Sequence, residues 1–169
     1  MFRILNREDV SDRYVGWLND PEVNKYLEVR FTPQTRSTCE EFVESMKIDP
    51  ASYFFGIFDK ANNSHIGNIK IGFIDVTHRS AELGLVIGEK EYWGKGYATE
   101  AIRSITQWGF NSIGLQRIEA GCYDSNMGSL RAFLKTGYAV EGFKRSCVES
   151  EGARVGCFSL AIIHSDCLR

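Results

Sequence analysis

The chain has few prolines, no long apolar run and no run of basic residues. Its 169 residues include 3 prolines and carry a formal net charge of −2. No apolar stretch approaches the roughly 20 residues that a membrane-spanning helix needs, and no basic cluster indicates a nucleic-acid partner. The N-terminal segment becomes polar too early for a signal peptide. We therefore expect a cytoplasmic protein with neither a membrane nor a nucleic-acid partner.

The cysteines and histidines are too scattered for a metal site. No CxxC pair occurs, and an odd number of dispersed cysteines is not a disulfide framework. We expect reduced thiols and no metal. With 43% hydrophobic and 25% charged residues, the chain is long enough to bury its own core. The residues concerned are Cys39, Cys122, Cys147, Cys157, Cys167, His65, His78 and His164.

The stretch 81–99 organises the rest of the chain. Residues 83–87 form an apolar run of strand length, and an amphipathic helical pattern starts at Tyr97. Gly94 and Gly96 lie just before that helix. Glycines let backbone approach a ligand, and the free amide N–H groups of a first helical turn bind anions. The pattern predicts a strand, an anion-binding loop and a helix, although the glycines alone also fit an ordinary connection.

Two common phosphate loops do not fit this stretch. The nucleoside-triphosphate loop needs G-x-x-x-x-G-K-[ST], but Gly88 precedes Gly94 by one residue too many and Gly96 stands where the hydroxyl residue belongs. The dinucleotide fingerprint needs a glycine where Thr99 stands, and the intervening 89–93 is too long for its tight turn. Both interpretations are set aside.

Apolar periodicity and turn residues predict the remaining elements. The order of strands and helices indicates one mixed α/β (α+β) domain over 1–169, with helices on both faces of a central sheet. We expect Asn126 to cap one helix and Gly137 to end it. The predicted strands are 2–5, 53–58, 65–73, 79–87, 116–122, 139–147 and 154–163, and the predicted helices are 10–18, 38–46, 97–111 and 126–135.

The segment Glu91-Tyr-Trp-Gly94-Lys-Gly96 resembles the acetyl-CoA loop [QR]-x-x-G-x-[GA] of the GCN5-related N-acetyltransferases, the GNAT family. Glu91 departs from the usual Gln or Arg. The run 92–101 is similar to the RimJ/RimL-type branch, which acetylates ribosomal proteins. Further similar motifs occur at 117–121, 126–129 and 135–138, so the resemblance covers about half of the chain.

The resemblance implies a fold and a cofactor. The fold is a mostly antiparallel sheet of about seven strands, with helices on both faces and a splayed strand pair that holds coenzyme A. Acetyl-CoA is the expected cofactor, and a backbone N–H near Val86 would face the thioester oxygen. The residues implied to hold the cofactor are Leu85, Val86, Ile87, Gly88, Trp93, Gly94, Lys95, Gly96, Tyr97, Ala98, Thr99, Asn126, Ser129 and Phe133.

Direct acetyl transfer to an amine in a ternary complex needs a base for the ammonium and an acid for the thiolate. Glu82 is the candidate base, since partial desolvation beside Leu83 would strengthen it. The alternatives are a salt bridge to Arg79, a carboxylate that is merely solvent-exposed at the end of the strand, or a catalytic water chain. Many relatives carry a tyrosine acid where Phe133 stands. The acid role therefore falls to Ser129, Tyr123 or water.

The acceptor is the least determined part. In the resembled family the early helical region forms one wall of the acceptor site, which makes Trp17, Tyr26, Arg30 and Phe31 candidate substrate contacts. The alternative is that they are ordinary core and surface residues. An aromatic platform and an arginine suit a nucleotide-linked amino sugar, so we favour a small-molecule amine. A protein N-terminus, a non-catalytic acyl-CoA-binding domain and a homodimer are left open.

Overall fold

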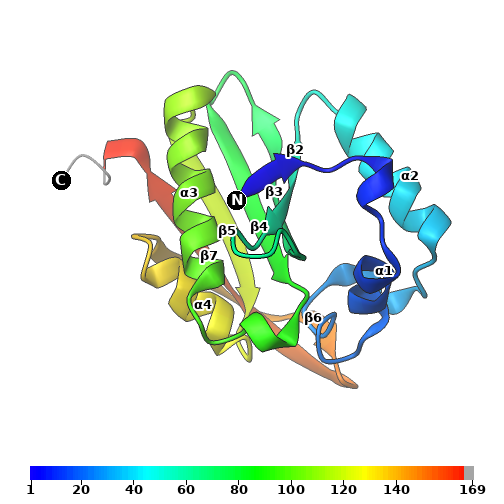
Figure 1. Cartoon of the computed structure of the whole chain (residues 1–169). Helices are drawn as coiled ribbons and strands as arrows, with labels where there is room; N and C mark the ends of the chain where they lie inside the picture. The colour runs from blue at the N-terminus through cyan, green and yellow to red at the C-terminus, as the bar shows by residue number, and fades with distance from the viewer. Residues whose placement is uncertain (166–169) are drawn as a thin grey trace.

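Figure 1 shows a central sheet between two helical layers, with α3 and α4 on one side and α1 and α2 on the other. The computed structural model describes residues 1–165, so Cys167 lies outside the described residues. The predicted elements are all present, with ends shifted by a few residues at most. The strands are β1 (Phe2–Ile4), β2 (Tyr53–Phe58), β3 (His65–Asp75), β4 (Ser80–Ile87), β5 (Arg117–Tyr123), β6 (Ala139–Ser150) and β7 (Ala153–Ile163); the helices are α1 (Asp12–Asn19), α2 (Arg36–Ile48), α3 (Tyr97–Ser112) and α4 (Met127–Leu134), with short 3-10 turns η1 (Arg7–Asp9), η2 (Glu28–Phe31) and η3 (Lys90–Tyr92).

The seven strands form one sheet in the order β1-β2-β3-β4-β5-β7-β6. Every neighbouring pair is antiparallel except β4 and β5, which run parallel and are joined through α3. The predicted mostly antiparallel sheet is therefore confirmed. The last hairpin enters the sheet in reverse order, so that β7 rather than β6 lies beside β5.

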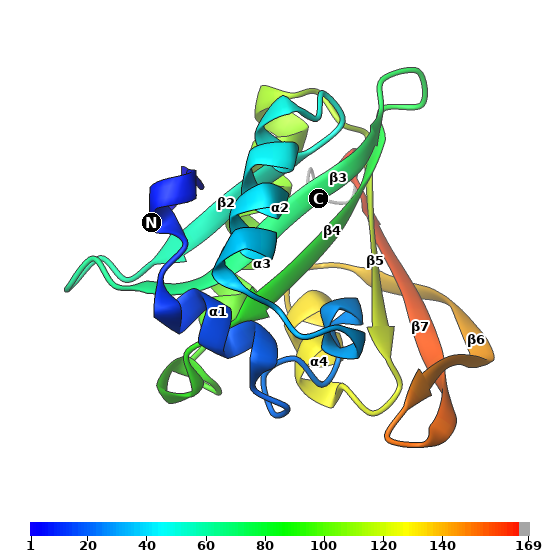
Figure 2. The ribbon, with the colours of Figure 1, turned by 90° about the vertical axis from the view of Figure 1, so that its right-hand side faces the viewer.

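Alternation along the strands sends side chains to two separate hydrophobic cores. On the side of α3 and α4, buried residues such as Ile69, Leu83 and Ile118 pack with both helices. On the other side, Val43 and Phe58 belong to a smaller core beneath α1 and α2. Figure 2 views this second side, where α1 and α2 lie in front of β2 and β3 and no helix lies in front of β6 and β7.

The parallel pair β4–β5 separates after a short contact. Ser80, Ala81 and Glu82 pair with Arg117, Ile118 and Glu119, and no further pairing follows. Yet β4 continues to Ile87 and β5 to Tyr123. The opened strands face each other across a gap, which is the splayed pair expected from the sequence.

Two predicted helix ends are confirmed. The Asn126 side chain accepts a hydrogen bond from the Ser129 N–H at 3.1 Å and caps α4. Gly137 follows α4 with a φ of 97°, in the left-handed region that favours glycine. None of the helices within residues 1–165 is both long enough and apolar enough to cross a membrane.

Candidate active site

The loop after β4 leads into the N-terminus of α3 through Gly94 and Gly96. Their φ values are 72° and 88°, and a Cβ on either would meet nothing within 4 Å. These positions therefore require glycine for their backbone conformation and leave the space above them open. Gly96 is the N-cap of α3 and gives no side-chain hydrogen bond to the first turn. The first-turn amides of this 16-residue helix are thus left for an anion.

Side chains of the loop hold it in place. The Trp93 indole N–H donates to the Ile87 carbonyl at 2.7 Å, which folds the loop back on the end of β4. The Tyr92 hydroxyl donates to Asp59 at 2.9 Å. The loop is thereby fixed to two strand ends, and its glycines and free amides suit the pyrophosphate of coenzyme A. The adjoining β4–β5 gap suits the pantetheine arm of coenzyme A, because the amide groups of that arm can form hydrogen bonds with the backbone of an open strand edge.

Glu82 lies at the point where β4 and β5 separate. It is exposed, and its Cα partner in the parallel ladder is Glu119, which is exposed as well. Arg117 donates to Glu119 at 2.7 Å, whereas within residues 1–165 Glu82 forms no ion pair or side-chain hydrogen bond. The expected desolvation of Glu82 is wrong, because alternation turns it away from the core that holds Leu83. Of the two structural alternatives, the salt bridge to Arg79 does not form, and the solvent-exposed position on the strand is the one found.

Tyr123 ends β5 on the same face of the sheet as Glu119. Its side chain is 8% exposed, and its hydroxyl donates to Glu28 at 2.5 Å. Burial, followed by the Glu28 carboxylate, raises the pKa of Tyr123. The phenol therefore keeps its proton at neutral pH and can donate it. Of the three groups considered for the acid, Tyr123 is positioned at the open end of β5.

Of the site residues predicted on or next to helix α4, two lie near the end of β5 and the third is buried in the core. Asn126 and Ser129 lie at its N-terminus, near the end of β5, and both are half-buried. Phe133 is 1% exposed and packs against Tyr138 with ring centroids 4.9 Å apart. Phe133 is thus a core residue, and its predicted contact with the cofactor does not fit this position.

The segment around η2 forms a wall at the end of β5. The Tyr26 hydroxyl donates to the Ser125 carbonyl at 3.2 Å, and its ring lies edge-on to Tyr123 at 5.7 Å. Arg30 donates to the Leu27 carbonyl at 2.7 Å and to the Glu149 carbonyl at 2.6 Å. Its guanidinium also lies over the ring of Phe31, 4.1 Å from the centroid. Tyr26 and Arg30 therefore lie next to Tyr123, and Phe31 packs on Arg30; their part in acceptor binding stays a prediction.

Two predicted contacts need correction. Trp17 is 6% exposed, its indole N–H donates to Glu89 at 2.9 Å, and its ring covers Gly88 so closely that a Cβ there would lie 2.0 Å from it. Trp17 is not a free stacking platform. The Arg30 side chain is 12% exposed with both terminal nitrogens on backbone carbonyls, so it is not free for a diphosphate.

Sequence reasoning missed the partners that fix these residues. Arg30 reaches across 119 positions to the β6–β7 tip, and Trp17 across 72 to Glu89. Periodicity reports only neighbours along one element, so no local signal marks such links.

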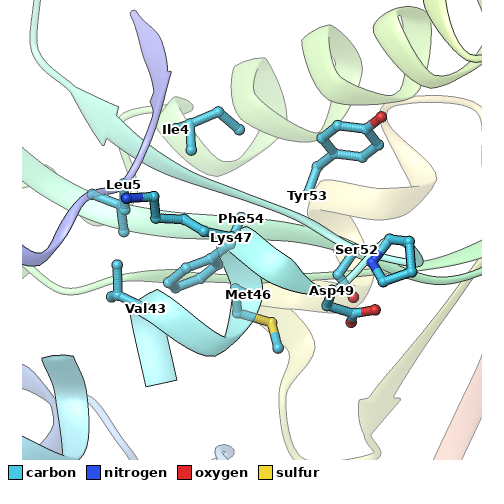
Figure 3. Close-up of a pocket in the computed structure, with 10 residues that line it drawn as sticks. Ile4, Leu5, Val43, Met46, Lys47, Asp49, Ser52, Tyr53 and Phe54 are labelled. Atoms are coloured by element: carbon cyan, nitrogen blue, oxygen red, sulfur yellow. The ribbon is translucent and has the colours of Figure 1, made fainter. Parts of the chain in front are cut away.

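A cavity of about 370 Å³ lies away from the gap. Figure 3 shows it between the end of β1, helix α2 and the start of β2, with Leu5, Val43 and Phe54 among its walls. None of the predicted site residues lines it. This cavity adds nothing to the arrangement around Glu82 and Tyr123.

Comparisons with known proteins identify the family of the chain. The profile of the family described as Acetyltransferase (GNAT) domain matches residues 1–139. An uncharacterized N-acetyltransferase, YoaA, of Bacillus subtilis is 35% identical over 90% of this chain and 86% of its own length. The spermidine N(1)-acetyltransferase of Escherichia coli K12 is 32% identical over 83% of this chain and 73% of its own length.

A solved structure has the same fold. The spermidine N-acetyltransferase of Vibrio cholerae, crystallised with CoA and spermine, matches with a TM-score of 0.89, covering 100% of this chain and 98% of its own, at 23% identity. At 23% identity, this structural similarity is evidence for the fold only. These relatives do not separate the RimJ/RimL-type branch from others, so that finer assignment stays a prediction.

Proposed function

Because the chain belongs to the GNAT acetyltransferase family and is an acetyl-CoA-dependent N-acetyltransferase, we propose that its acceptor is a linear polyamine, acetylated on a primary amine. The observation that carries this proposal is a pair of exposed carboxylates, Glu82 and Glu28, at the two ends of an open sheet face. Linear polycations bind to carboxylates spaced along a groove, and each such contact is a charge-assisted hydrogen bond.

The spacing of the two carboxylates suits such a ligand. Glu82 is level with Glu119, and Glu28 holds the hydroxyl of Tyr123, four residues further along β5. Four strand residues span about 13 Å. Between these ends, Gly84 and Gly121 leave the floor without side chains, and a Cβ on Gly84 would meet nothing within 4 Å. An extended diamine or triamine therefore has room between Glu82 and Glu28. The Glu28 Oε1 atom accepts from Tyr123 and lies 3.6 Å from an Arg30 nitrogen, so the amine would bind at the second oxygen of this exposed carboxylate.

The chain's own groups supply the proton transfers. Bound acetyl-CoA supplies the acetyl thioester that the amine attacks. Glu82 takes the proton from the acceptor ammonium, directly or through water, because it is exposed and has no cationic partner within residues 1–165. Tyr123 is the candidate proton donor on β5, since its phenol is kept protonated and is held by Glu28. Because it lies four residues along β5 from the level of Glu82, its proton would reach the thiolate through water. Ser129 at the start of α4 is the second candidate for that role.

The amino-sugar preference drawn from the sequence depended on Trp17 and Arg30. Both are engaged within the fold, as described above. The 32% identity to a spermidine N(1)-acetyltransferase supports the polyamine instead. The cytoplasmic location, the homodimer and the extension of the single domain over 1–169 remain predictions alongside it.

A thiol-release assay with acetyl-CoA tests the proposal. The acceptor panel is spermidine, spermine and putrescine, a nucleotide-linked amino sugar, and short peptides with free N-termini. We expect turnover on the polyamines. Turnover confined to peptides or to the sugar nucleotide would contradict the polyamine assignment while leaving the acetyltransferase activity intact.

A variant that removes the charge of Glu28 tests whether this residue binds the acceptor. Glu28→Gln should raise the KM for the polyamine and leave that for acetyl-CoA nearly unchanged, because a lost charge-assisted hydrogen bond costs about 1.5–3 kcal/mol. Glu44→Gln, on the outer side of α2, removes the same charge from the protein and serves as the control. Equal KM values in the two variants would show that Glu28 does not bind the acceptor.

A further inference from the structure

Two thiols lie side by side where the last hairpin is irregular. In β6 the register breaks between Lys144 and Val148, whose partners on β7 are Cys157 and Val155. Three residues of β6, 145–147, thus face only Gly156 and form a bulge. Cys147 ends this bulge, and its thiol donates to the Lys144 carbonyl at 3.3 Å. Lys144 is in turn the ladder partner of Cys157, so the bulge brings the two cysteines next to each other across the hairpin.

Cys147 and Cys157 are partly accessible to solvent and are not joined by a disulfide. Both cysteines are free and half-buried, whereas Cys39 and Cys122 are buried. The backbone of the bulge is already distorted, since Ser146 has a φ of 48° and its carbonyl accepts two hydrogen bonds from Arg154. A bulge of this kind can adjust by small backbone rotations, which a regular ladder resists. The bulge is therefore the part of the hairpin that can adjust when the two sulfur atoms are joined.

The pair also adjoins the acceptor wall. On its other side, Cys157 is the ladder partner of Tyr123. Two residues beyond Cys147, the Glu149 carbonyl accepts the hydrogen bond of Arg30. A covalent link at the bulge would fix the part of the hairpin that supports η2.

We propose that Cys147 and Cys157 form a redox modification site, which hydrogen peroxide closes to an intramolecular disulfide. The Cys147 thiolate attacks one oxygen of hydrogen peroxide and the O–O bond breaks. The products are a sulfenic acid and hydroxide, which becomes water by taking up the proton that the Cys147 thiol had released. The Cys157 sulfur then attacks the sulfenyl sulfur, and the S–S bond forms as the hydroxyl leaves as a second water with the Cys157 proton. Two thiols are oxidised and one peroxide is reduced to water.

The order of the two steps follows from burial. Burial raises the pKa of the Cys157 thiol to about 12, with a further contribution from Cys147. At neutral pH Cys157 is therefore a poor first nucleophile, and it serves as the resolving thiol once Cys147 has been oxidised. The effect of the disulfide on turnover rests on the proposed function, whereas its formation does not.

Peptide mapping tests the site directly. The full-length protein is treated with hydrogen peroxide, its remaining thiols are alkylated, and it is digested without reductant and analysed by mass spectrometry. We expect one cross-linked peptide pair containing Cys147 and Cys157, lost on treatment with dithiothreitol, while Cys39 and Cys122 are recovered alkylated. Oxidation of Cys147 to a sulfinic acid without the cross-link, cross-links to other cysteines only, or no reaction would each overturn the proposal.

Single serine variants and kinetics complete the test. Cys147→Ser and Cys157→Ser should each abolish the cross-link and leave the basal turnover of the reduced enzyme unchanged. In the wild type, peroxide should raise the KM for the polyamine severalfold without changing that for acetyl-CoA, and dithiothreitol should reverse the change. If no polyamine is a substrate, the proposed function fails while the peptide map still decides the disulfide. A KM shift that persists in Cys147→Ser would assign the peroxide effect to another group.

Discussion

At the scale of single residues, neighbouring carboxylates have different surroundings. Glu82 and Glu119 are partners in the parallel ladder, but Arg117 binds Glu119 and leaves Glu82 without a cation among the described residues. A carboxylate already bound by a guanidinium is less available to a substrate ammonium than one without a cationic partner. The difference makes Glu119 an internal control for the role of Glu82.

Replacing Glu82 by glutamine should lower kcat on the order of a hundredfold, the usual contribution of a general base. The KM for acetyl-CoA should change little. Glu82 points away from the face of β4 that packs against α3, and the first turn of α3 is the part assigned to the pyrophosphate. Glu119→Gln, one strand away, should retain most of the activity. Steady-state kinetics over pH check both variants, and near-native kcat in Glu82→Gln would assign the proton transfer to water or to another group.

Arg30 has a positioning role instead of the predicted substrate contact. Arg30→Ala removes both hydrogen bonds to the carbonyls of Leu27 and Glu149, and should loosen the wall around Tyr123. We expect a higher KM for the amine, an unchanged KM for acetyl-CoA and a lower Tm. Arg145→Ala removes an exposed arginine from the β6–β7 hairpin that Arg30 contacts, and it should change neither KM nor the Tm. A normal amine KM in a destabilised Arg30→Ala protein would leave Arg30 with a purely structural role.

At the scale of elements, the anion-binding loop depends on two glycines in the left-handed region. Gly96 and Gly114 both have positive φ and open space around a Cβ, so a leucine at either position should cost about 1–2 kcal/mol of strain. Only Gly96→Leu should weaken coenzyme A binding, because its side chain would occupy the space above the first turn of α3. Calorimetric titration with coenzyme A compares the two folded variants. Equal affinities would contradict the assignment of this loop to the pyrophosphate.

Strands and helices were predictable from the sequence, and their arrangement was only partly so. The β-prone run Tyr53–Phe58 and the helix from Tyr97 are found with nearly the predicted bounds, because local periodicity and glycines determine them. The position of β7 between β5 and β6 was not predicted, since a hairpin can join a sheet by either strand. The exposure of Glu82 was misjudged for a different reason: alternation places Glu82 on the face of β4 opposite Leu83, and the apolar neighbours along the strand therefore do not cover it.

At the scale of the whole molecule, a half-buried histidine couples stability to pH. His65 donates from Nε2 to Asn68 at 2.8 Å, and its buried Nδ1 has no hydrogen-bond partner among residues 1–165. Burial lowers the pKa of His65 from 6.5. As the pH falls through about 6.5, the unfolded chain takes up a proton that the folded protein does not. The free energy of unfolding should therefore be constant above this range and fall below it, by at most about 1.4 kcal/mol per pH unit for one group.

Denaturant unfolding at a series of pH values checks this dependence. His65→Gln should be less stable at neutral pH, but its stability should not fall between about pH 6.5 and 5. Hydrogen bonds from the Ala61 N–H and Tyr92 lower the pKa of Asp59, so its contribution is lost only in a more acidic range. A wild-type fall in stability that persists unchanged in His65→Gln would assign the effect to other groups.

The reversed entry of the last hairpin has a consequence for synthesis of the chain on the ribosome. Strands β1 to β5 can pair as soon as residue 123 has emerged, but the free edge of β5 is covered only by β7, which begins at Ala153. Until then, a nascent chain exposes an unpaired strand next to an already opened gap, and such edges template association with other chains. The acceptor wall, whose support includes Glu149, is completed in the same final interval. The enzyme should thus be most prone to aggregation, and still inactive, just before its last strand is released.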